Sequence, residues 1–282
     1  MTMGQERTRQ TTQTSGAADP APSATVVVAR AGNGAPEFLL VRRHAHAAFG
    51  ASHVFPGGLV EVQDRAAQRC CRSLSAVEAN RCLGLEEGAL DYYSAAIREL
   101  FEETGVLLAR DASGRLPAAA SGHDGEPYPK ERLELLSGGL SWPDLLERHS
   151  LTLCADRLTY FAWWITPAAR PARFSTRFFM ASLPPGQAAH HDGRELTDSC
   201  WMTAVDALAA GQQGELQLPP PTAATLRDLS GLARLDDLQE WAGRRAAAGV
   251  SPVLPVIETR NGRERIIMPG DDDYPSDAGE RR

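Results

Sequence analysis

The first strongly apolar positions of the chain fall in short runs that are typical of β-strands. Residues 24–31 are rich in β-branched side chains, residues 38–43 form a second run, and the Gly-rich stretch 32–36 between them predicts a hairpin. A short strand ending at Phe55 leads into Pro56-Gly57-Gly58. Two glycines are free to adopt positive φ angles, so we expect the backbone of this turn to come close to a ligand.

A helical period replaces the strand pattern in the next part of the chain. A short helix is predicted over 74–83 and a longer one over about 87–104, where Gly105 can close the helix. The core-facing side of the longer helix is marked by apolar residues at helical spacing: Leu90, Tyr93, Ile97, Leu100 and Phe101. Residues 106–109 predict a buried strand, and we expect the Gly-, Ser- and Pro-rich stretch up to residue 127 to be mobile.

The second half of the chain alternates between the two patterns. Strands are predicted over 158–166, 173–183 and 196–202, and helices over 130–136, 142–149, 204–210, 222–229 and 235–245. Trp163 and Trp164 fall on opposite faces of one strand, where core packing is the simpler interpretation and a pocket for one ring is the alternative. The stretch 253–268, with Asn261-Gly262 at its centre, predicts a hairpin. The chain is therefore of the α/β class.

These patterns divide the chain into three parts. Residues 1–23 have almost no large apolar side chains, which predicts a disordered tail. Residues 24–250 form the main domain, with an insertion at about 65–90, and residues 251–282 form a C-terminal hairpin and acidic tail. With 282 residues, 43% of them hydrophobic and 23% charged, the chain is long and apolar enough for one large globular domain.

Charge and cysteine content narrow the classes of partner and compartment. The net charge is -7 with no basic cluster, so we expect no nucleic-acid partner. The N-terminus lacks the apolar segment of a signal peptide, and the longest apolar stretch is far below the roughly 20 residues of a membrane-spanning helix, so we expect no membrane partner. Five cysteines without a C-x-x-C pair favour a reducing, cytoplasmic location. A homodimer is left open.

The most informative stretch for chemistry is the end of the long predicted helix. Glu99, Glu102 and Glu103 are spaced so that all three carboxylates share one helical face. Like charges at this spacing repel, so a cation should compensate them. Because carboxylate oxygens suit hard divalent ions, Mg²⁺ or Mn²⁺ is the predicted cofactor. The alternative for the isolated pattern is a solvated acidic helix end.

The surroundings of these carboxylates favour the metal site. Phe55-Pro56-Gly57-Gly58 lies upstream, and Arg98 precedes the acids in a segment that ends at Gly105-Val106. Together these motifs resemble the signature of the Nudix hydrolases. Counted from Gly58, the family's spaced Glu falls on Asp64, and 33 residues then precede Arg98 where the family has seven, an excess of 26 that we interpret as an insertion. Glu61 is a second candidate for the missing Glu.

The interrupted signature resembles one branch of the family, related to the peroxisomal coenzyme A diphosphatase. The resemblance covers roughly residues 25–235 and rests on several further segments: Leu39-Leu40-Val41-Arg42-Arg43, Arg177-Phe178-Phe179-Met180-Ala181, Trp201-Met202-Thr203 and Leu218-Pro219-Pro220-Pro221-Thr222. Ala48 stands where the branch has an Arg in its coenzyme A signature, so the resemblance leaves the substrate open.

The resemblance implies a role for each candidate residue. Glu99, Glu102, Glu103 and the carbonyl of Gly57 become metal ligands. Glu99, or a metal-bound hydroxide that depends on it, supplies the base, and Arg98 orients a ligating carboxylate. Glu195 is the candidate for an additional catalytic acid from a later loop, with a solvated turn residue as the alternative. The candidates for binding substrate are Gly57, Gly58, Arg42 and Arg43, and the two arginines point to opposite strand faces, so at most one is expected to reach phosphate.

The family resemblance also implies a fold and a reaction. The expected fold is an α/β/α sandwich with a mixed sheet, enlarged by the insertion and by a C-terminal helical extension. The expected reaction is metal-dependent hydrolysis of a diphosphate linkage in a small nucleoside diphosphate derivative, coenzyme A or its esters among them. The alternatives are a sensor that binds such a metabolite without cleaving it, or a pyrophosphatase for ADP-ribose, NADH or dinucleoside polyphosphates.

Overall fold

A mixed eight-stranded sheet forms the centre of the computed structural model, which describes residues 18–43, 51–117, 119, 125–191, 196–260 and 263–276. Its strands are β1 (Ala21–Ala31), β2 (Pro36–Arg43), β3 (His53–Val54), β4 (Gly57–Leu59), β7 (Thr159–Ile165), β8 (Phe174–Ser182), β9 (Leu196–Thr203) and β10 (Pro252–Val253). The order along the sheet is β10-β7-β8-β1-β2-β3, with β9 beside β2 and β4 beside β1. The pairs β1–β8 and β10–β7 are parallel and the remaining pairs are antiparallel, which confirms the mixed sheet.

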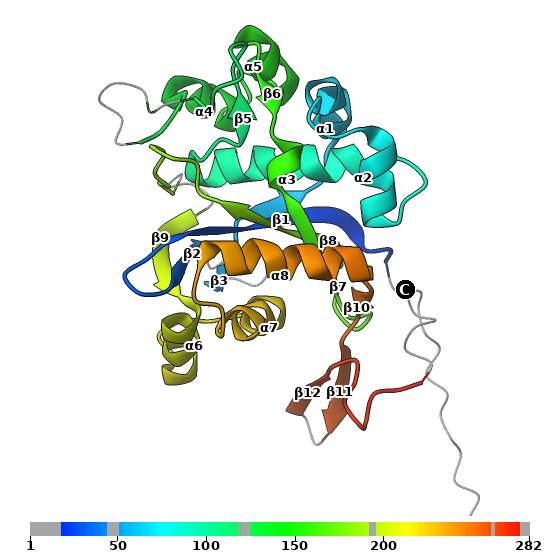
Figure 1. Cartoon of the computed structure of the whole chain (residues 1–282). Helices are drawn as coiled ribbons and strands as arrows, with labels where there is room; N and C mark the ends of the chain where they lie inside the picture. Colours follow the sequence, from blue (N-terminus) through cyan, green and yellow to red (C-terminus); the bar gives the residue numbers. More distant parts are fainter. Residues whose placement is uncertain are drawn as a thin grey trace, which may run out of the picture.

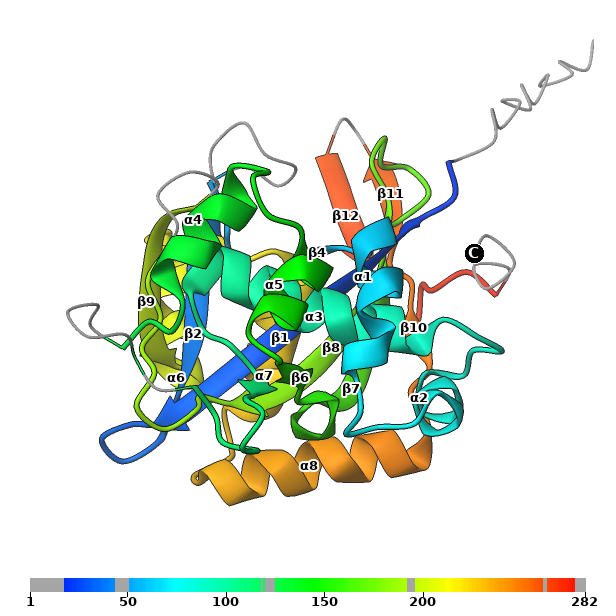
Figure 2. The same cartoon turned by 90° about the horizontal axis from the view of Figure 1, so that it is seen from above.

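Helices cover both faces of this sheet (Figure 1). On one face lie α1 (Val62–Ala67), α2 (Ala76–Leu83), α3 (Ala89–Thr104), α4 (Pro129–Leu136) and α5 (Trp142–Arg148). On the other lie α6 (Ala204–Gln213), α7 (Pro220–Leu229) and α8 (Leu235–Ala248). The view from above shows α3 crossing β1, against which it packs (Figure 2). The chain is therefore the three-layer sandwich that the resemblance implied.

Two hydrophobic cores hold the layers together. One lies between α3 and its neighbours and the first face of the sheet, and includes the fully buried Ile97, Leu100 and Phe101. The other lies between the sheet and α6–α8, where Phe161 and Leu226 are fully buried. The helical stripe predicted for α3 is thus its core-facing side. Burial of such side chains contributes roughly 1.5–3 kcal/mol each relative to exposure.

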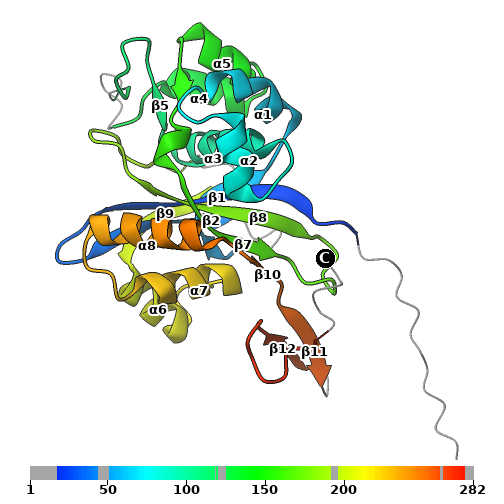
Figure 3. The same ribbon diagram turned by 45° about the vertical axis from the view of Figure 1, so that its right-hand side comes forward.

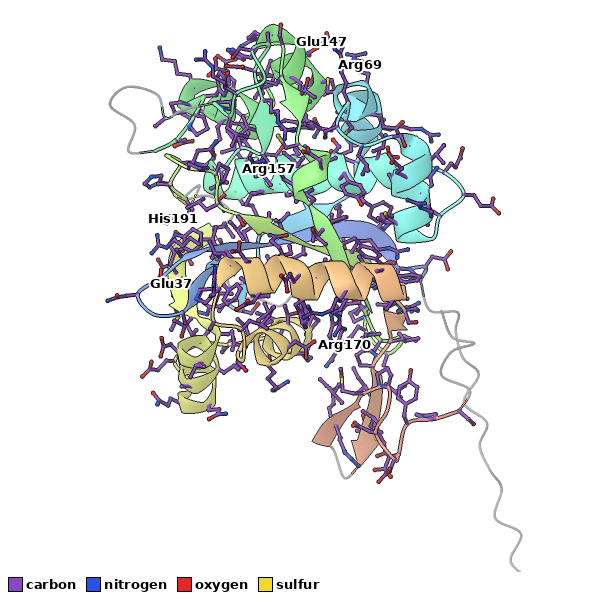
Figure 4. The ribbon with its side chains drawn as sticks, viewed as in Figure 1. Glu37, Arg69, Glu147, Arg157, Arg170 and His191 are labelled. Carbon is purple, nitrogen blue, oxygen red and sulfur yellow. The ribbon has the colours of Figure 1, made fainter. Side chains whose placement is uncertain are left out.

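The insertion is a folded support rather than a loose loop. It contains the last three residues of α1, the short 3-10 helix η1 (Gln68–Cys70) and α2, and these three helices pack against α3. The ion pair between Arg69 and Glu147 joins η1 to α5 (Figure 4). The Gln68 side chain donates to Asp91 in the first turn of α3. The insertion is therefore fixed to α3, which itself packs against β1 of the sheet.

Both predicted hairpins are present. The β1–β2 pairing is antiparallel, and the C-terminal hairpin consists of β11 (Val256–Arg260) and β12 (Arg263–Ile267), which project from the sandwich below β10 (Figure 3). The short pair β5 (Ala109–Arg110) and β6 (Thr152–Leu153) and the 3-10 helix η2 (Ala155–Arg157) complete the fold.

Three local predictions were wrong. The tail was expected to reach residue 23, but β1 begins at Ala21 because it pairs with β8 from that residue onward; residues 1–17 lie outside the described part of the chain. Residues 106–108 are fully buried but are not a strand, since the Gln187 side chain accepts from the Leu107 N–H and donates to its carbonyl. Of the two turn glycines, Gly57 alone has a positive φ angle, and both belong to β4.

Candidate functional site

A cavity of about 1160 Å³ opens beside β4 and the end of α3. Its lining includes acidic side chains of α3 and strand β4, and also residues of β7, β8, the α6–α7 segment and the C-terminal hairpin. Strand β1 pairs with β2 at residues 29–31 and with β4 at residues 23–25. Because β1 changes partner along its length, β4 presents its two glycines to the end of α3.

Arg98 is the central residue of the acidic end. It is 1% exposed, and its Nε and Nη2 donate to the two carboxylate oxygens of Asp64 at 3.1 and 3.0 Å. Nη1 donates to Glu99 at 3.0 Å and to Glu102 at 3.1 Å, and Nη2 also donates to the Leu59 carbonyl at 2.8 Å. Although burial acts to lower it, the pKa of Arg98 is raised by Glu99, Asp64 and Glu102. This guanidinium therefore ties the insertion, β4 and α3 together.

Asp64 and Glu61, the two candidates for the missing acid, lie in different environments. Asp64 is fully buried and accepts from Arg98, from the Ser94 hydroxyl at 3.0 Å and from the Glu61 N–H at 2.9 Å. Burial raises the pKa of Asp64, and Arg98 offsets part of that cost. Glu61 is exposed at the cavity wall. Asp64 thus anchors Arg98, whereas Glu61 is the carboxylate open to the cavity.

The three glutamates of α3 all line the cavity. The Glu99 and Glu102 side chains are 12% and 18% exposed, and Glu103 is 5% exposed with its Oε2 accepting from the Gly57 N–H at 2.9 Å. Burial raises the pKa of Glu99, and burial together with the nearby Glu99 and Glu61 charges raises the pKa of Glu102 to about 8. The cluster therefore carries more negative charge than Arg98 compensates.

The two glycines of β4 leave room for these carboxylates. A Cβ on Gly58 would lie 2.3 Å from Oε1 of Glu99, and one on Gly57 would lie 2.3 Å from the Ala24 carbonyl oxygen. A side chain at position 58 would displace the carboxylate of Glu99, while one at position 57 would collide with β1. The close backbone approach predicted for this segment is therefore made to Glu99 and to the neighbouring strand.

The donors at this end fit a hard divalent cation by their chemistry. Carboxylate oxygens of Glu99, Glu102 and Glu103 meet at one cavity end, with Glu61 close enough to raise the pKa of Glu102. In the described part of the chain, however, no three His, Cys, Asp or Glu side chains are already arranged as a set of metal ligands. Arg98 bridges Glu99 and Glu102 instead, so a bound cation would require these side chains to turn.

The remaining predicted site residues divide into one outside the cavity lining, two that are not described, and Gly57, which lines the cavity. Arg42 on β2 is exposed and does not line it. The side chain of Arg43 and all of Glu195 lie outside the described residues. The structure shows the N–H of Gly57 bonded to Glu103, and the ligand role of its carbonyl stays a prediction.

The sequence analysis missed Arg132, which contacts the end of α3 without lining the cavity, and the contribution of the C-terminal hairpin to the cavity lining. Arg132 is buried and donates to the carbonyl of Glu102 at 3.0 Å, to Glu126 at 3.0 Å and to the His190 carbonyl at 2.9 Å, so it holds the last turn of α3. Part of the cavity wall is formed by Trp164 and residues of the C-terminal hairpin. Trp164 is 7% exposed in the second hydrophobic core and also lines the cavity, so both interpretations apply to it. The guanidinium carbon of Arg177 lies 3.6 Å from the centre of the Trp163 ring.

Comparison with known proteins identifies named proteins to which this chain is similar. No family model matches the chain. The chain is 30% identical over 284 residues to acyl-coenzyme A diphosphatase NUDT19 of Gallus gallus, spanning 86% of this chain and 73% of the relative. It is 29% identical over 279 residues to the Homo sapiens protein of the same name, spanning 85% and 72%.

A solved structure supports the same relationship. A NUDIX hydrolase from Alicyclobacillus acidocaldarius shares 28% sequence identity with this chain and superposes with a TM-score of 0.64, covering 79% of this chain and 96% of that one. Among the described helices, none combines the length and apolar character needed to cross a membrane.

Proposed function

Because the chain belongs to the Nudix hydrolase family, we propose that it cleaves the diphosphate linkage of coenzyme A and its thioesters with the help of a divalent metal ion, Mg²⁺ or Mn²⁺. The reaction class, hydrolysis of a diphosphate, follows from the family. The coenzyme A substrate and the identity of the metal go beyond what membership of the family shows. They rest on the relatives' name and on the chemistry of the acidic cavity end.

The observation that carries the proposal is the concentration of buried carboxylates at one end of a single large cavity. Glu99, Glu102 and Glu103 line this end, and Arg98 alone compensates them among the described lining residues. Such an arrangement costs free energy unless a cation joins it. A bound divalent cation would neutralise the diphosphate and lower the pKa of the attacking water. The cavity supplies the room for a substrate of the size of coenzyme A.

Each residue of the acidic end has a separate task in this proposal. Glu99, Glu102 and Glu103 would hold the cation, and Glu99 would accept the proton of the attacking water. Arg98 keeps Glu99 and Glu102 in reach of each other, and Asp64 keeps the guanidinium in place. The Gly57 N–H fixes Glu103.

The sensor alternative was motivated by the interrupted Nudix signature. Asp64, the residue directly before the predicted insertion, accepts two hydrogen bonds from Arg98. The contacts among Asp64, Arg98 and the glutamates of α3 are therefore present despite the interruption, and we favour the hydrolase over the sensor. A cytoplasmic location and a homodimer stay predictions.

The test is hydrolysis of coenzyme A with Mg²⁺ or Mn²⁺, with products resolved by mass. Cleavage should release adenosine 3′,5′-bisphosphate and 4′-phosphopantetheine. Glu103→Gln keeps an acceptor for the Gly57 N–H but removes the charge, so it should abolish turnover and leave the fold intact. Glu134→Gln, which alters an exposed pair with Arg148 on α4 and α5, is the matched control and should keep full activity.

Substrate choice is tested with the same assay on a panel. ADP-ribose, NADH and dinucleoside polyphosphates should be cleaved more slowly than coenzyme A and its esters. A higher kcat/KM for one of these compounds would replace the proposed substrate, and unchanged turnover by Glu103→Gln would refute the assigned site.

A further inference from the structure

The C-terminal hairpin contributes apolar residues to the cavity lining. Ile257 on β11 and Ile266 on β12 are directly opposite each other in the hairpin, and both line the cavity together with Pro255. Ile266 is 40% exposed, which is high for a large aliphatic side chain beside other apolar groups. This isoleucine pair therefore presents hydrocarbon surface to the cavity that no described part of the chain fully covers.

The opposite wall is apolar as well. It combines side chains of β7, β8 and the segment between α6 and α7: Trp164, Ile165, Phe174, Phe178, Leu216 and Leu218, followed by Pro219, Pro220 and Pro221. Phe178 and Trp164 are 5% and 7% exposed, so they are fixed parts of the second hydrophobic core. The space between this aromatic and proline surface and the isoleucine pair is thus an apolar slot.

The slot offers little to a charged ligand. Among the described residues that line the cavity, the cationic side chains are Arg98 and Arg170. Arg98 is surrounded by the carboxylates, and Arg170 is bonded to Glu264 of β12 at 2.7 Å (Figure 4). A phosphorylated ribose placed in the slot would have no unpaired cation to bind among the described lining residues. A neutral chain with an apolar end fits it, since apolar surface gains free energy when it leaves water.

The hairpin is held in place at its base and at its side. Strand β10 extends the main sheet by pairing with β7, and the Arg170–Glu264 ion pair joins the β7–β8 loop to β12. A two-stranded hairpin alone is at best marginally stable. Its position over the cavity therefore depends on these attachments, and a ligand that covers the isoleucine pair would add to them.

We propose that Ile257 and Ile266 form a binding site for the acyl chain of a coenzyme A thioester, so that the C-terminal hairpin sets the preference for chain length. This inference rests on the proposed function, because the diphosphate must lie at the carboxylates for the acyl-pantetheine arm to run toward the hairpin. It adds a site that the glutamates of α3 do not require, since free coenzyme A would leave the slot empty.

Equilibrium binding to the full chain tests the site without turnover. We would titrate acetyl-, octanoyl- and dodecanoyl-coenzyme A by calorimetry in EDTA, which removes divalent metal. Burying one methylene corresponds to about a fourfold gain in affinity, so octanoyl-coenzyme A should bind at least about tenfold more tightly than acetyl-coenzyme A. In the Ile257→Ser/Ile266→Ser double variant, that ratio should fall below about threefold. Val77→Ser, at a side chain 79% exposed on α2, is the control and should keep the ratio.

The outcomes separate this proposal from the proposed function. Equal affinity for all three thioesters in the unmodified protein, or an unchanged ratio in the double variant, would overturn the acyl site. If no thioester binds in EDTA, the titration is repeated with Mg²⁺ in the Glu103→Gln variant, and absence of binding there would overturn it. Hydrolysis of free coenzyme A with Mg²⁺ is measured in parallel. Absence of that hydrolysis with a preserved chain-length ratio would refute the proposed reaction and leave the acyl site standing.

Discussion

Removing the charge of Asp64 tests the view that this residue anchors the acidic end of the cavity. Asp64→Asn keeps the volume of the side chain, so the change is one of charge and hydrogen bonding. The carboxylate is fully buried and accepts two hydrogen bonds from Arg98. The variant would leave the guanidinium 1% exposed with Glu99 and Glu102 as its remaining carboxylate partners.

The expected loss follows from burial. Removing one partner of a buried ion pair costs about 3–5 kcal/mol. For a domain of this size, each kcal/mol lowers Tm by about 2–4 °C, so Tm should fall by about 6–20 °C. Urea unfolding followed by tryptophan fluorescence gives the free energy of unfolding, and calorimetry gives Tm. Turnover should fall together with stability, because Arg98 would no longer fix Glu99 and Glu102.

The control is an ion pair of the same chemistry at the surface. Glu134 and Arg148 are bonded at 3.0 Å, but their side chains are 50% and 48% exposed. Glu134→Gln should therefore change the free energy of unfolding by less than about 1 kcal/mol. If Asp64→Asn were no more destabilised than Glu134→Gln and kept full turnover, the anchoring role assigned to Asp64 would be refuted.

Three further predictions concern pH, packing and thiol chemistry. Because the pKa of Glu102 is raised to about 8, the folded protein binds a proton there, and the metal-free protein should lose stability as pH rises from about 4.5 to about 8. Mn²⁺ should therefore raise Tm more at about pH 8.5 than at about pH 6. A Glu102→Gln variant with the same pH dependence of stability would contradict this. Gly58→Ala should cut turnover at least about tenfold by displacing Glu99, whereas Gly231→Ala, where nothing lies within 4 Å, should be neutral by the same assay. Cys82 is exposed, and burial raises the pKa of Cys71 to about 12, so a thiol reagent should label Cys82 before Cys71. Labelling of Cys71 at an equal rate, measured by mass spectrometry, would refute this.

The parts of the site that could be predicted from sequence are those in which local spacing determines the geometry. The carboxylates of α3 share a face because a helix has a fixed period, and Gly105 ends the helix in the left-handed conformation that its lack of a side chain favours. The hairpins followed from short turns between apolar runs. These signals lie within a few residues of each other along the chain.

The remaining features depend on contacts between distant residues. Residues 106–108 are as apolar as a strand, but Gln187, far along the chain, satisfies the backbone of Leu107. The role of Asp64 depends on Arg98 across the whole insertion, and Gly58 is restricted by the Glu99 carboxylate rather than by its own backbone angles. The apolar wall requires β10 to pair with β7 about ninety residues earlier, and no local pattern encodes that pairing.

The way in which the insertion is attached to α3 limits how such a segment can diverge between relatives. Asp64, the residue directly before the insertion, is bound to Arg98, so this end of the segment is constrained together with the helix that holds the glutamates. The outer helix α2 has its Val77 side chain 79% exposed and contributes no residue to the cavity. Length changes and new surface properties should therefore accumulate around α2, where the branch can acquire regulatory sequences while its chemistry stays the same.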